Sequence, residues 1–588
     1  MNFLNFIFLD DEVDLSDDVP SDEDDSDEEE EKTVSSDPLL EAKNWIWQSG
    51  PAPTASFDVS SATEGKPANL GRYSKDLRPV DYFFKVFPVD FFRIAVEETN
   101  NYAKQVLGLP RVSISGTFRQ VDEGEVYRFI SILLLMGVFR LRRKTDYWTA
   151  GKVSVVRFPS FIHIQTLKRF KQIKRFFHLA DNLNMPNQGS PNYDKLYKVR
   201  RVYSILQQTF RDNWKPGTFL SLDESMTPWK GRSSLKQYMR SKPVRWGFKF
   251  FCVCDAATGY FLEYELFTGS QSLVEKYGLC TDVVLRLCRQ AHLQNSQKIL
   301  VADNYYSSPL LCAALANVGI GYVGTCRLTR RFVPSDLISF PVRQVNIERG
   351  KSKCAWINLN TVDPQLPVTP LFMCSWKDTR IANFIGTAVG LESVELIRRN
   401  RKGKESKVPA PKMIQHYNER MGGVDRADQN KARFSVSAIV VTRKWWMRIF
   451  SGLLDMAIGN AWILYKHAME GLERLDHQDF ILTVAESLID AGRAASSRAS
   501  LPFSPNSDRH EIVPQNGSTD CVVCSQNGHR KRSSYTCNVC RVPLCFQTCF
   551  KQFHDLQLVV SKHVKRCELG TISTQLSLDL DIQYCELK

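Results

Sequence analysis

The sequence has no apolar run long enough to cross a bilayer. The run at residues 129–138 is about half as long as a membrane-spanning helix requires. The apolar start at residues 1–9 has no basic residues before it and leads directly into acidic ones, which is not the pattern of a secretory signal. We therefore expect an intracellular protein with no membrane partner.

Regular cysteine spacing is absent before residue 500, where eight of the sixteen cysteines lie. These eight are predicted to be reduced core thiols, and a disulfide framework is excluded. The 31 glycines and 26 prolines are too few for a fibrous or wholly disordered chain. Because 588 residues exceed what one hydrophobic core usually organises, several folded units are expected.

Basic side chains are scarce only at the start of the chain. Residues 1–40 contain sixteen Asp or Glu and one Lys, so residues 41–588 carry a net charge of +28. A body this basic favours a polyanionic partner such as nucleic acid, although ribosome-associated and membrane-surface proteins have a similar balance. Residues 1–75, acidic and then rich in Ser, Pro and Ala, are predicted to form a disordered tail.

The middle of the chain changes from a helical to a strand pattern near residue 219. Before it, apolar and basic residues alternate at helical spacing, for example at 126–141 and 164–177, which suits either DNA contact or a solvated helix face. After it, the pattern predicts three strands, a helix at 281–291, a strand at 299–302, a helix at 308–318 and a strand at 322–326. This β-β-β-α-β-α-β order is that of an RNase H-like core, a mixed β-sheet with helices.

The rest of the chain completes a multidomain α/β organisation. Residues 331–410 are predicted to form a β-rich insertion that ends in a basic run at 398–404, which is either a nuclear localisation signal or a solvated loop. The predicted parts are a tail (1–75), a helical part (76–215), a core (216–330), the insertion (331–410), a second core part (411–443), a second helical part (444–494), a linker (495–517), a cysteine-rich domain (518–560) and a tail (561–588).

Four aspartates stand where strands and a helix are predicted to end or begin. Asp223 follows the apolar run 219–222, and Asp303 follows 298–302, so both are expected at strand tips. Asp425 and Asp428 are three residues apart and share one face if they are helical. An aspartate after a strand is usually a turn or cap residue. Three that converge would instead bind divalent metal, because Mg²⁺ prefers oxygen ligands and two ions can act on one phosphodiester.

At these positions the sequence resembles the piggyBac transposase family. The resemblance is carried, in the family's order and spacing, by SLDESM at 221–226, GR at 231–232, KPVRWGFK at 242–249, ADNYYSS at 302–308 and MGGVDRADQ at 421–429. It covers roughly residues 75–565. It implies that Asp223, Asp303 and Asp425 are the catalytic carboxylates, with Asp428 a fourth metal-binding carboxylate beside them.

The resemblance also implies an activity and its partners. It implies a Mg²⁺-dependent cut-and-paste DNA transposase with a two-ion site, which acts in the nucleus on double-stranded transposon ends and TTAA targets. It further implies that the two helical parts form one dimerisation and DNA-binding domain in a homodimer. Trp445 would support the DNA end by stacking, or be a core aromatic. Arg245 and Lys249 are candidate phosphate contacts, or solvated strand charges.

The last cysteines have the spacing of a zinc module. The pattern C-x2-C-x12-C-x2-C-x4-C-x3-C-x4-H has few apolar residues, so zinc bound by thiolates would have to supply the free energy of folding. With a histidine in the first loop there are eight ligands, enough for two Zn²⁺ in a cross-braced arrangement whose pairing the spacing leaves open. The candidate ligands are Cys521, Cys524, His529, Cys537, Cys540, Cys545, Cys549 and His554.

Two other functions remain open. A domesticated, transposase-derived protein would keep the fold as a sequence-specific DNA-binding or chromatin-associated protein without using the chemistry. A chromatin adaptor would use the zinc module to read a peptide and the rest as a scaffold. The intact aspartates favour an enzyme, because a chain freed from catalysis has no physical reason to keep an unneutralised acidic cluster.

Overall fold

A computed structural model gives the fold of two compact units, residues 1–498 and 499–588. In the first unit the structure describes residues 37–68, 76–107, 118–149, 160–340 except 241, 243 and 270–274, 347–399 and 405–498. In the second it describes 499, 512–521, 523–524, 530–537, 543–545 and 549.

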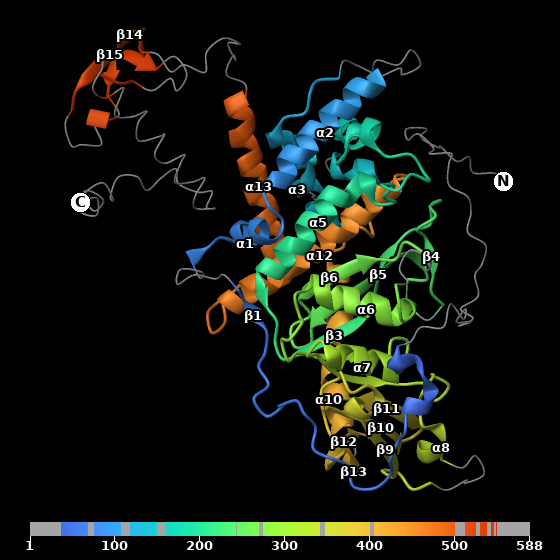
Figure 1. Cartoon of the computed structure of the whole chain (residues 1–588). Helices are drawn as coiled ribbons and strands as arrows, with labels where there is room; N and C mark the ends of the chain where they lie inside the picture. The colour runs from blue at the N-terminus through green and yellow to red at the C-terminus, as the bar shows by residue number, and fades with distance from the viewer. Residues whose placement is uncertain are drawn as a thin grey trace, which may run out of the picture. The chain divides into compact units, whose positions relative to one another are not determined.

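Helices that lie far apart in the sequence pack together in the first unit (Figure 1). Tyr82 of α1 meets the ring of Tyr465 of α12 with centroids 5.6 Å apart, and Phe91 of α2 stacks on Phe450 of α12 at 5.3 Å. Helix α12 is apolar nearly all round because neighbours cover it. No helix among the described residues is both long and apolar enough to span a membrane. These helices are α1 (Pro79–Val86), α2 (Asp90–Leu107), α3 (Glu123–Phe139), α4 (Leu167–Phe176), α5 (Tyr197–Asp212), α12 (Trp445–Ala468) and α13 (His477–Ala499).

The predicted strands form one sheet. Within the described residues nine strands take part, in the order β4-β5-β3-β7-β8-β11-β10-β9, with β6 paired to β5. Strand β3 pairs antiparallel with β5 and parallel with β7, and β7 pairs parallel with β8. The bounds are β3 (Phe219–Pro228), β4 (Gln237–Tyr238), β5 (Trp246–Asp255), β6 (Phe261–Leu266), β7 (Ile299–Ala302) and β8 (Gly321–Thr325), with α6 (Leu279–Gln290) and α7 (Pro309–Asn317) between strands. The predicted order of strands and helices is therefore confirmed, with the two-residue strand β4 as an addition.

The β-rich insertion is not separate from this sheet. Its strand β11 pairs antiparallel with β8, which covers an edge that would otherwise expose unpaired backbone groups. The insertion strands are β9 (Ser352–Asn358), β10 (Pro370–Lys377) and β11 (Ile381–Gly386), and a hairpin of β12 (Ser393–Arg399) and β13 (Glu405–Pro411) follows. The short helices are α8 (Ser335–Ile338) and α9 (Leu359–Val362), and α10 (Lys412–Arg420) leads into α11 (Gly423–Arg433).

The predicted disorder of residues 1–75 does not hold for residues 37–68. Two short 3-10 helices, η1 (Pro38–Leu40) and η2 (Ala42–Asn44), are followed by Trp45, which is buried and stacks on Phe332 with ring centroids 5.0 Å apart. Further on, β1 (Lys66–Pro67) pairs with β2 (Trp214–Lys215). The prediction rested on the average composition of residues 1–75. It gave no weight to single large aromatic side chains such as Trp45, which packs on Phe332 and fixes this segment. Residues 1–36 and 69–75 lie outside the described part.

A close approach joins α3 to the end of α11. A Cβ at Gly137 would lie 2.4 Å from the carbonyl oxygen of Phe434. Nearby, Arg140 donates to the carbonyl oxygens of Ala432 and Arg433 at 2.8 and 2.6 Å. We expect Gly137→Ala to lower the free energy of unfolding by about 1–3 kcal/mol, although alanine is the better helix former.

The matched control is Gly459→Ala in α12. A Cβ there has no heavy atom within 4 Å, so the helix preference of alanine should stabilise the protein by up to about 1 kcal/mol. Denaturant unfolding of the two variants should give opposite signs. A stabilising Gly137→Ala would contradict the contact.

A buried histidine makes the helical part sensitive to acid. His178 stacks on Tyr102 with ring centroids 3.5 Å apart, and burial, with Lys444 nearby, lowers the pKa of His178 to about 3. In the unfolded chain His178 takes up a proton near pH 6.5, whereas in the folded protein it stays neutral until about pH 3. The free energy of unfolding is therefore highest above pH 6.5 and falls as the pH drops towards 3. The fall from pH 7 to 5 should be about 2 kcal/mol, and urea unfolding of His178→Gln should show a smaller pH dependence than the parent protein.

Candidate functional site

Asp223 lies within a strand rather than at its tip, which corrects the sequence prediction. Strand β3 continues to Pro228 because β5 pairs with its whole length. What ends at Leu222 is the pairing with β7, whose last residue, Ala302, is its partner. Asp223 therefore stands where β3 loses its parallel neighbour, at the carboxyl end of β7. Ligand sites in α/β sheets commonly form at such strand ends.

Asp303 follows the last residue of β7, as predicted. It therefore leaves the sheet beside Asp223, one residue beyond the same register pair. Its Oδ1 accepts from the backbone N–H of Tyr305 at 3.0 Å, and its carbonyl oxygen accepts from the Ser307 hydroxyl at 2.8 Å. These bonds fix the turn that carries the carboxylate.

Helix α11 crosses the face of β3 that carries Asp223. The Ser221 hydroxyl accepts from the N–H of Gly423 at 3.0 Å, and a Cβ at Gly423 would lie 2.5 Å from that hydroxyl. Two residues beyond Asp223, the Ser225 hydroxyl donates to Asp428 at 2.6 Å. Because alternate residues of a strand share a face, Asp223 lies between two contacts with the helix. Asp425 is exposed in the first turn of α11, between the residues that make these contacts.

Asp223 and Asp303 are half-buried, Glu224 is buried, and the three carboxylates are electrostatically unequal. Burial and then the neighbouring Glu224 carboxylate raise the pKa of Asp223 to about 8, against the effect of Lys242. Burial also acts to raise the pKa of Glu224. A hydrogen bond with Asp223 and the positive charges of Lys249 and Lys242 outweigh it and lower the pKa of Glu224. Burial and the charge of Glu224 raise the pKa of Asp303. Because these neighbouring negative charges repel one another, the site favours binding of a cation.

Sequence reasoning did not single out two members of this site, Glu224 and Lys242. Glu224 is 4% exposed, and Lys242 places its ammonium 3.0 Å from Asp223 and 3.8 Å from Glu224. Both lie inside the strings that carried the family resemblance, which was the available signal. Lys242 is therefore one of the positive charges held among these carboxylates. The carboxylate oxygens are the hard ligands that Mg²⁺ prefers.

The three predicted DNA-contact residues differ in exposure. Arg245 is exposed immediately before β5, and Trp445 is half-buried as the first residue of α12. Lys249 is only 8% exposed, lies 3.6 Å from Glu224, and has its ammonium 4.4 Å from the ring centre of Tyr305. Its side chain therefore serves the buried carboxylate rather than the surface, which does not fit the predicted phosphate contact.

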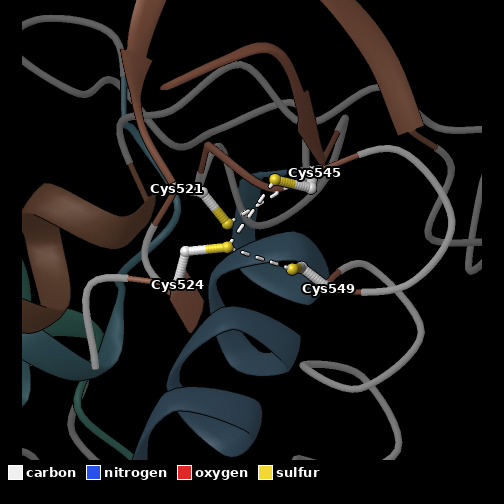
Figure 2. Close-up of side chains that lie close together, drawn as sticks. All are labelled: Cys521, Cys524, Cys545 and Cys549. Atoms are coloured by element: carbon white, nitrogen blue, oxygen red, sulfur yellow. Dashed lines mark hydrogen bonds between the residues drawn. The ribbon is translucent and has the colours of Figure 1, made fainter. Parts of the chain in front are cut away.

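The second unit brings four cysteines together (Figure 2). In the part of the chain that the structure describes, Cys521, Cys524, Cys545 and Cys549 are the set of three or more possible metal ligands whose ligand atoms all lie within 4.8 Å of one another. Among the described residues, no three of Asp223, Asp303, Asp425 and Asp428 form such a set.

The cysteine geometry fits a tetrahedral metal. The Cys524 sulfur lies 3.8 Å from that of Cys545 and 3.6 Å from that of Cys549. Four thiolates about 2.3 Å from one zinc ion would be about 3.8 Å apart. Burial acts to raise the pKa of Cys521, but hydrogen bonds from the backbone N–H groups of Cys524 and Cys545 outweigh it and lower this pKa to about 7. The lower pKa favours the thiolate form, which binds metal.

A short hairpin positions this set. Strand β14 (Ile512–Asp520) delivers Cys521 and pairs with β15 (Arg532–Cys537). The Ser533 hydroxyl donates to the carbonyl oxygen of Leu544 at 2.7 Å, which holds the segment before Cys545. Cys537 is buried at the end of β15 and is not in the set of four. The predicted ligands His529, Cys540 and His554 lie outside the described residues.

Each of the two units resembles a known protein family. The family model described as Transposase IS4 matches residues 78–462, and one described as DDE_Tnp_1-like zinc finger matches residues 505–555. The fold and the cysteine set thus define a transposase-type chain with a zinc finger in its C-terminal unit.

Two human relatives and one solved structure make the family specific. PiggyBac transposable element-derived protein 3 of Homo sapiens is 26% identical over 454 residues, 75% of this chain and 71% of the relative. PiggyBac transposable element-derived protein 2 of Homo sapiens is 26% identical over 486 residues, which cover 79% of this chain and 76% of the relative. A piggyBac transposase synaptic complex with hairpin DNA, solved by cryo-EM, has the same fold with a TM-score of 0.59, 21% identity, and coverage of 83% of this chain and 100% of that one. This chain belongs to the piggyBac-type transposase family.

Proposed function

We propose that this protein is a cut-and-paste DNA transposase whose catalytic carboxylates are Asp223, Asp303 and Asp425, with Asp428 beside them. The observation that carries the proposal is the parting of β3 from β7 directly before Asp223 and Asp303, with α11 laid across the same face. An antiparallel β6-β5-β3 group followed by parallel β7 and β8 supports an RNase H-like core.

The residues of this site would share the work of phosphodiester cleavage. Mg²⁺ held by these carboxylates would supply activation of the attacking oxygen and stabilisation of the leaving one. Asp303 is kept in place by its bonds to the turn at Tyr305 and Ser307, and Asp428 by Ser225 and Lys431. Lys242, now paired with Asp223, is placed to contact a phosphate oxygen once a divalent cation neutralises the carboxylates.

The finer features of the proposal come from the family. They are double-stranded transposon ends as substrate, joining at TTAA sites, a homodimer, and action in the nucleus. The basic charge of residues 41–588, +28, supports a DNA partner. Arg245 is exposed and Trp445 is half-buried, so both remain candidates for DNA contact.

The C-terminal unit is proposed to bind two structural zinc ions. The first ion would take Cys521, Cys524, Cys545 and Cys549, whose spacing suits it. Because this set takes ligands from the first and the third Cys groups, Cys537 is left with Cys540, His554 and His529 for the second ion, as in a cross-braced module.

The test is an excision assay with purified protein, Mg²⁺ and TTAA-flanked transposon ends. Product formation that depends on Asp303 would support the enzyme. DNA binding without product would favour the alternative, a domesticated DNA-binding or chromatin-associated protein. Binding to neither duplex nor single-stranded DNA would remove both functions.

A further inference from the structure

Two large aromatic rings stand exposed at the edge of the sheet. Tyr238 of β4 and Trp246 of β5 are direct cross-strand partners, and their ring centroids lie 4.7 Å apart at an angle of 44°. The rings remain 48% and 40% exposed. Large aromatic side chains usually contribute their area to a core, so an exposed pair is an unused stacking surface.

The pair borders an open cavity lined with lysine. Lys230, Lys236 and Trp246 line this space of about 350 Å³, which is open to solvent. The ammonium of Lys236 lies 4.8 Å from the ring centre of Trp246. The cavity therefore offers an aromatic face and positive charges together, the combination that binds a nucleobase and its phosphates.

The surrounding segment is uniformly basic. Residues 229–249 contain seven Lys or Arg and no Asp or Glu. Those exposed are Lys230, Arg232, Arg240 and Arg245. Lys242 and Lys249 pair with carboxylates outside the segment, whereas the four exposed side chains have no acidic residue within it, which suits contact with a polyanion.

This surface is within reach of the carboxylates. Trp246 lies six residues before Cys252, the cross-strand partner of Asp223, which corresponds to about 20 Å along β5. A strand within duplex DNA advances about 3.4 Å per nucleotide, so about 20 Å corresponds to about six stacked nucleotides, and to fewer in an extended single strand.

We infer that Tyr238, Trp246, Lys230 and Lys236 form a site for one unpaired nucleobase of the DNA strand that passes the carboxylates. The base stacks on the aromatic pair, and the lysines contact its flanking phosphates. The inference rests on the proposed function, because that function supplies the DNA. The site would hold the strand in register while Asp223 and Asp303 act on it.

The experiment uses the full chain with Asp303→Asn, without divalent metal, so that binding is measured apart from cleavage. The probe is a labelled duplex with a single-stranded extension of about ten nucleotides, and a fully paired duplex serves as comparison. Trp246→Ala should weaken binding of the extended probe about tenfold and leave the paired duplex nearly unchanged. Trp246→Phe, which keeps a ring, should retain most of the affinity.

A matched control and an abasic scan separate stacking from other effects. Leu183→Ala, at a 77% exposed position outside this surface, should change neither affinity. One abasic position in the extension should cost as much as Trp246→Ala, and that cost should vanish in Trp246→Ala because both remove the same contact.

Two results would overturn the inference. Equal affinity of Trp246→Ala and parent for the extended probe, with duplex binding intact, would remove the base site and leave the proposed function standing. Loss of binding that follows unfolding, seen as a lowered melting temperature of Trp246→Ala, would assign the pair to hairpin packing instead. Failure of the parent chain to bind any DNA would remove both.

Discussion

Asp303→Asn is expected to abolish strand cleavage while leaving the fold and DNA binding intact. The asparagine oxygen can still accept from the N–H of Tyr305, so the turn after β7 should survive. The negative charge is lost, and a carboxylate that holds a catalytic cation has no substitute there. We expect the excision rate to fall by about three orders of magnitude or more.

The control for this prediction is Asp336→Asn in α8. Asp336 is exposed in the first turn of α8 and is not part of the site, so the excision rate of this variant should equal that of the parent. Excision product should be quantified for both variants at equal DNA occupancy. Equal excision rates from Asp303→Asn and the parent would contradict the proposed transposase activity and favour a DNA-binding protein without catalysis.

Removing zinc is expected to unfold the C-terminal unit and spare the first. The described cluster of this unit is small, with Val523 and Leu544 as its buried residues besides cysteine. The metal should therefore supply folding free energy on the order of 10 kcal/mol. A chelator should make residues 512–549 sensitive to protease, while the unfolding of residues 1–498 stays unchanged, because the two units are separately compact.

Single cysteine variants make this prediction quantitative. The parent should bind about two zinc ions per chain, and Cys524→Ser and Cys537→Ser should each lose about one, from different sites. Cys567→Ser, which lies outside the ligand spacing, should lose none. Metal content by mass spectrometry gives the answer. Fewer than about one zinc per chain in the parent would contradict the assignment.

The sequence predicted where the four aspartates stand along the chain better than it predicted their surroundings. The apolar run before Asp303 predicted the buried strand β7, and the three-residue spacing of Asp425 and Asp428 suited the helix α11 that carries both. It misplaced Asp223, because β5 extends β3 beyond the point where β7 stops. Glu224 and Lys242 gave no separate signal, since their roles depend on side chains brought together from either side of a loop.

The sequence by itself determined the local units of this protein: the strand and helix order of the core, the basic body, and a cysteine spacing typical of a zinc module. Such features depend on neighbouring residues and on the periodicity of buried side chains. Only the tertiary structure decided that β11 joins the core sheet, that Trp45 anchors residues 37–68, and that Cys521 and Cys524 share a site with Cys545 and Cys549. These are contacts between segments distant in the chain, and their partners are chosen by packing and register, which no local pattern records.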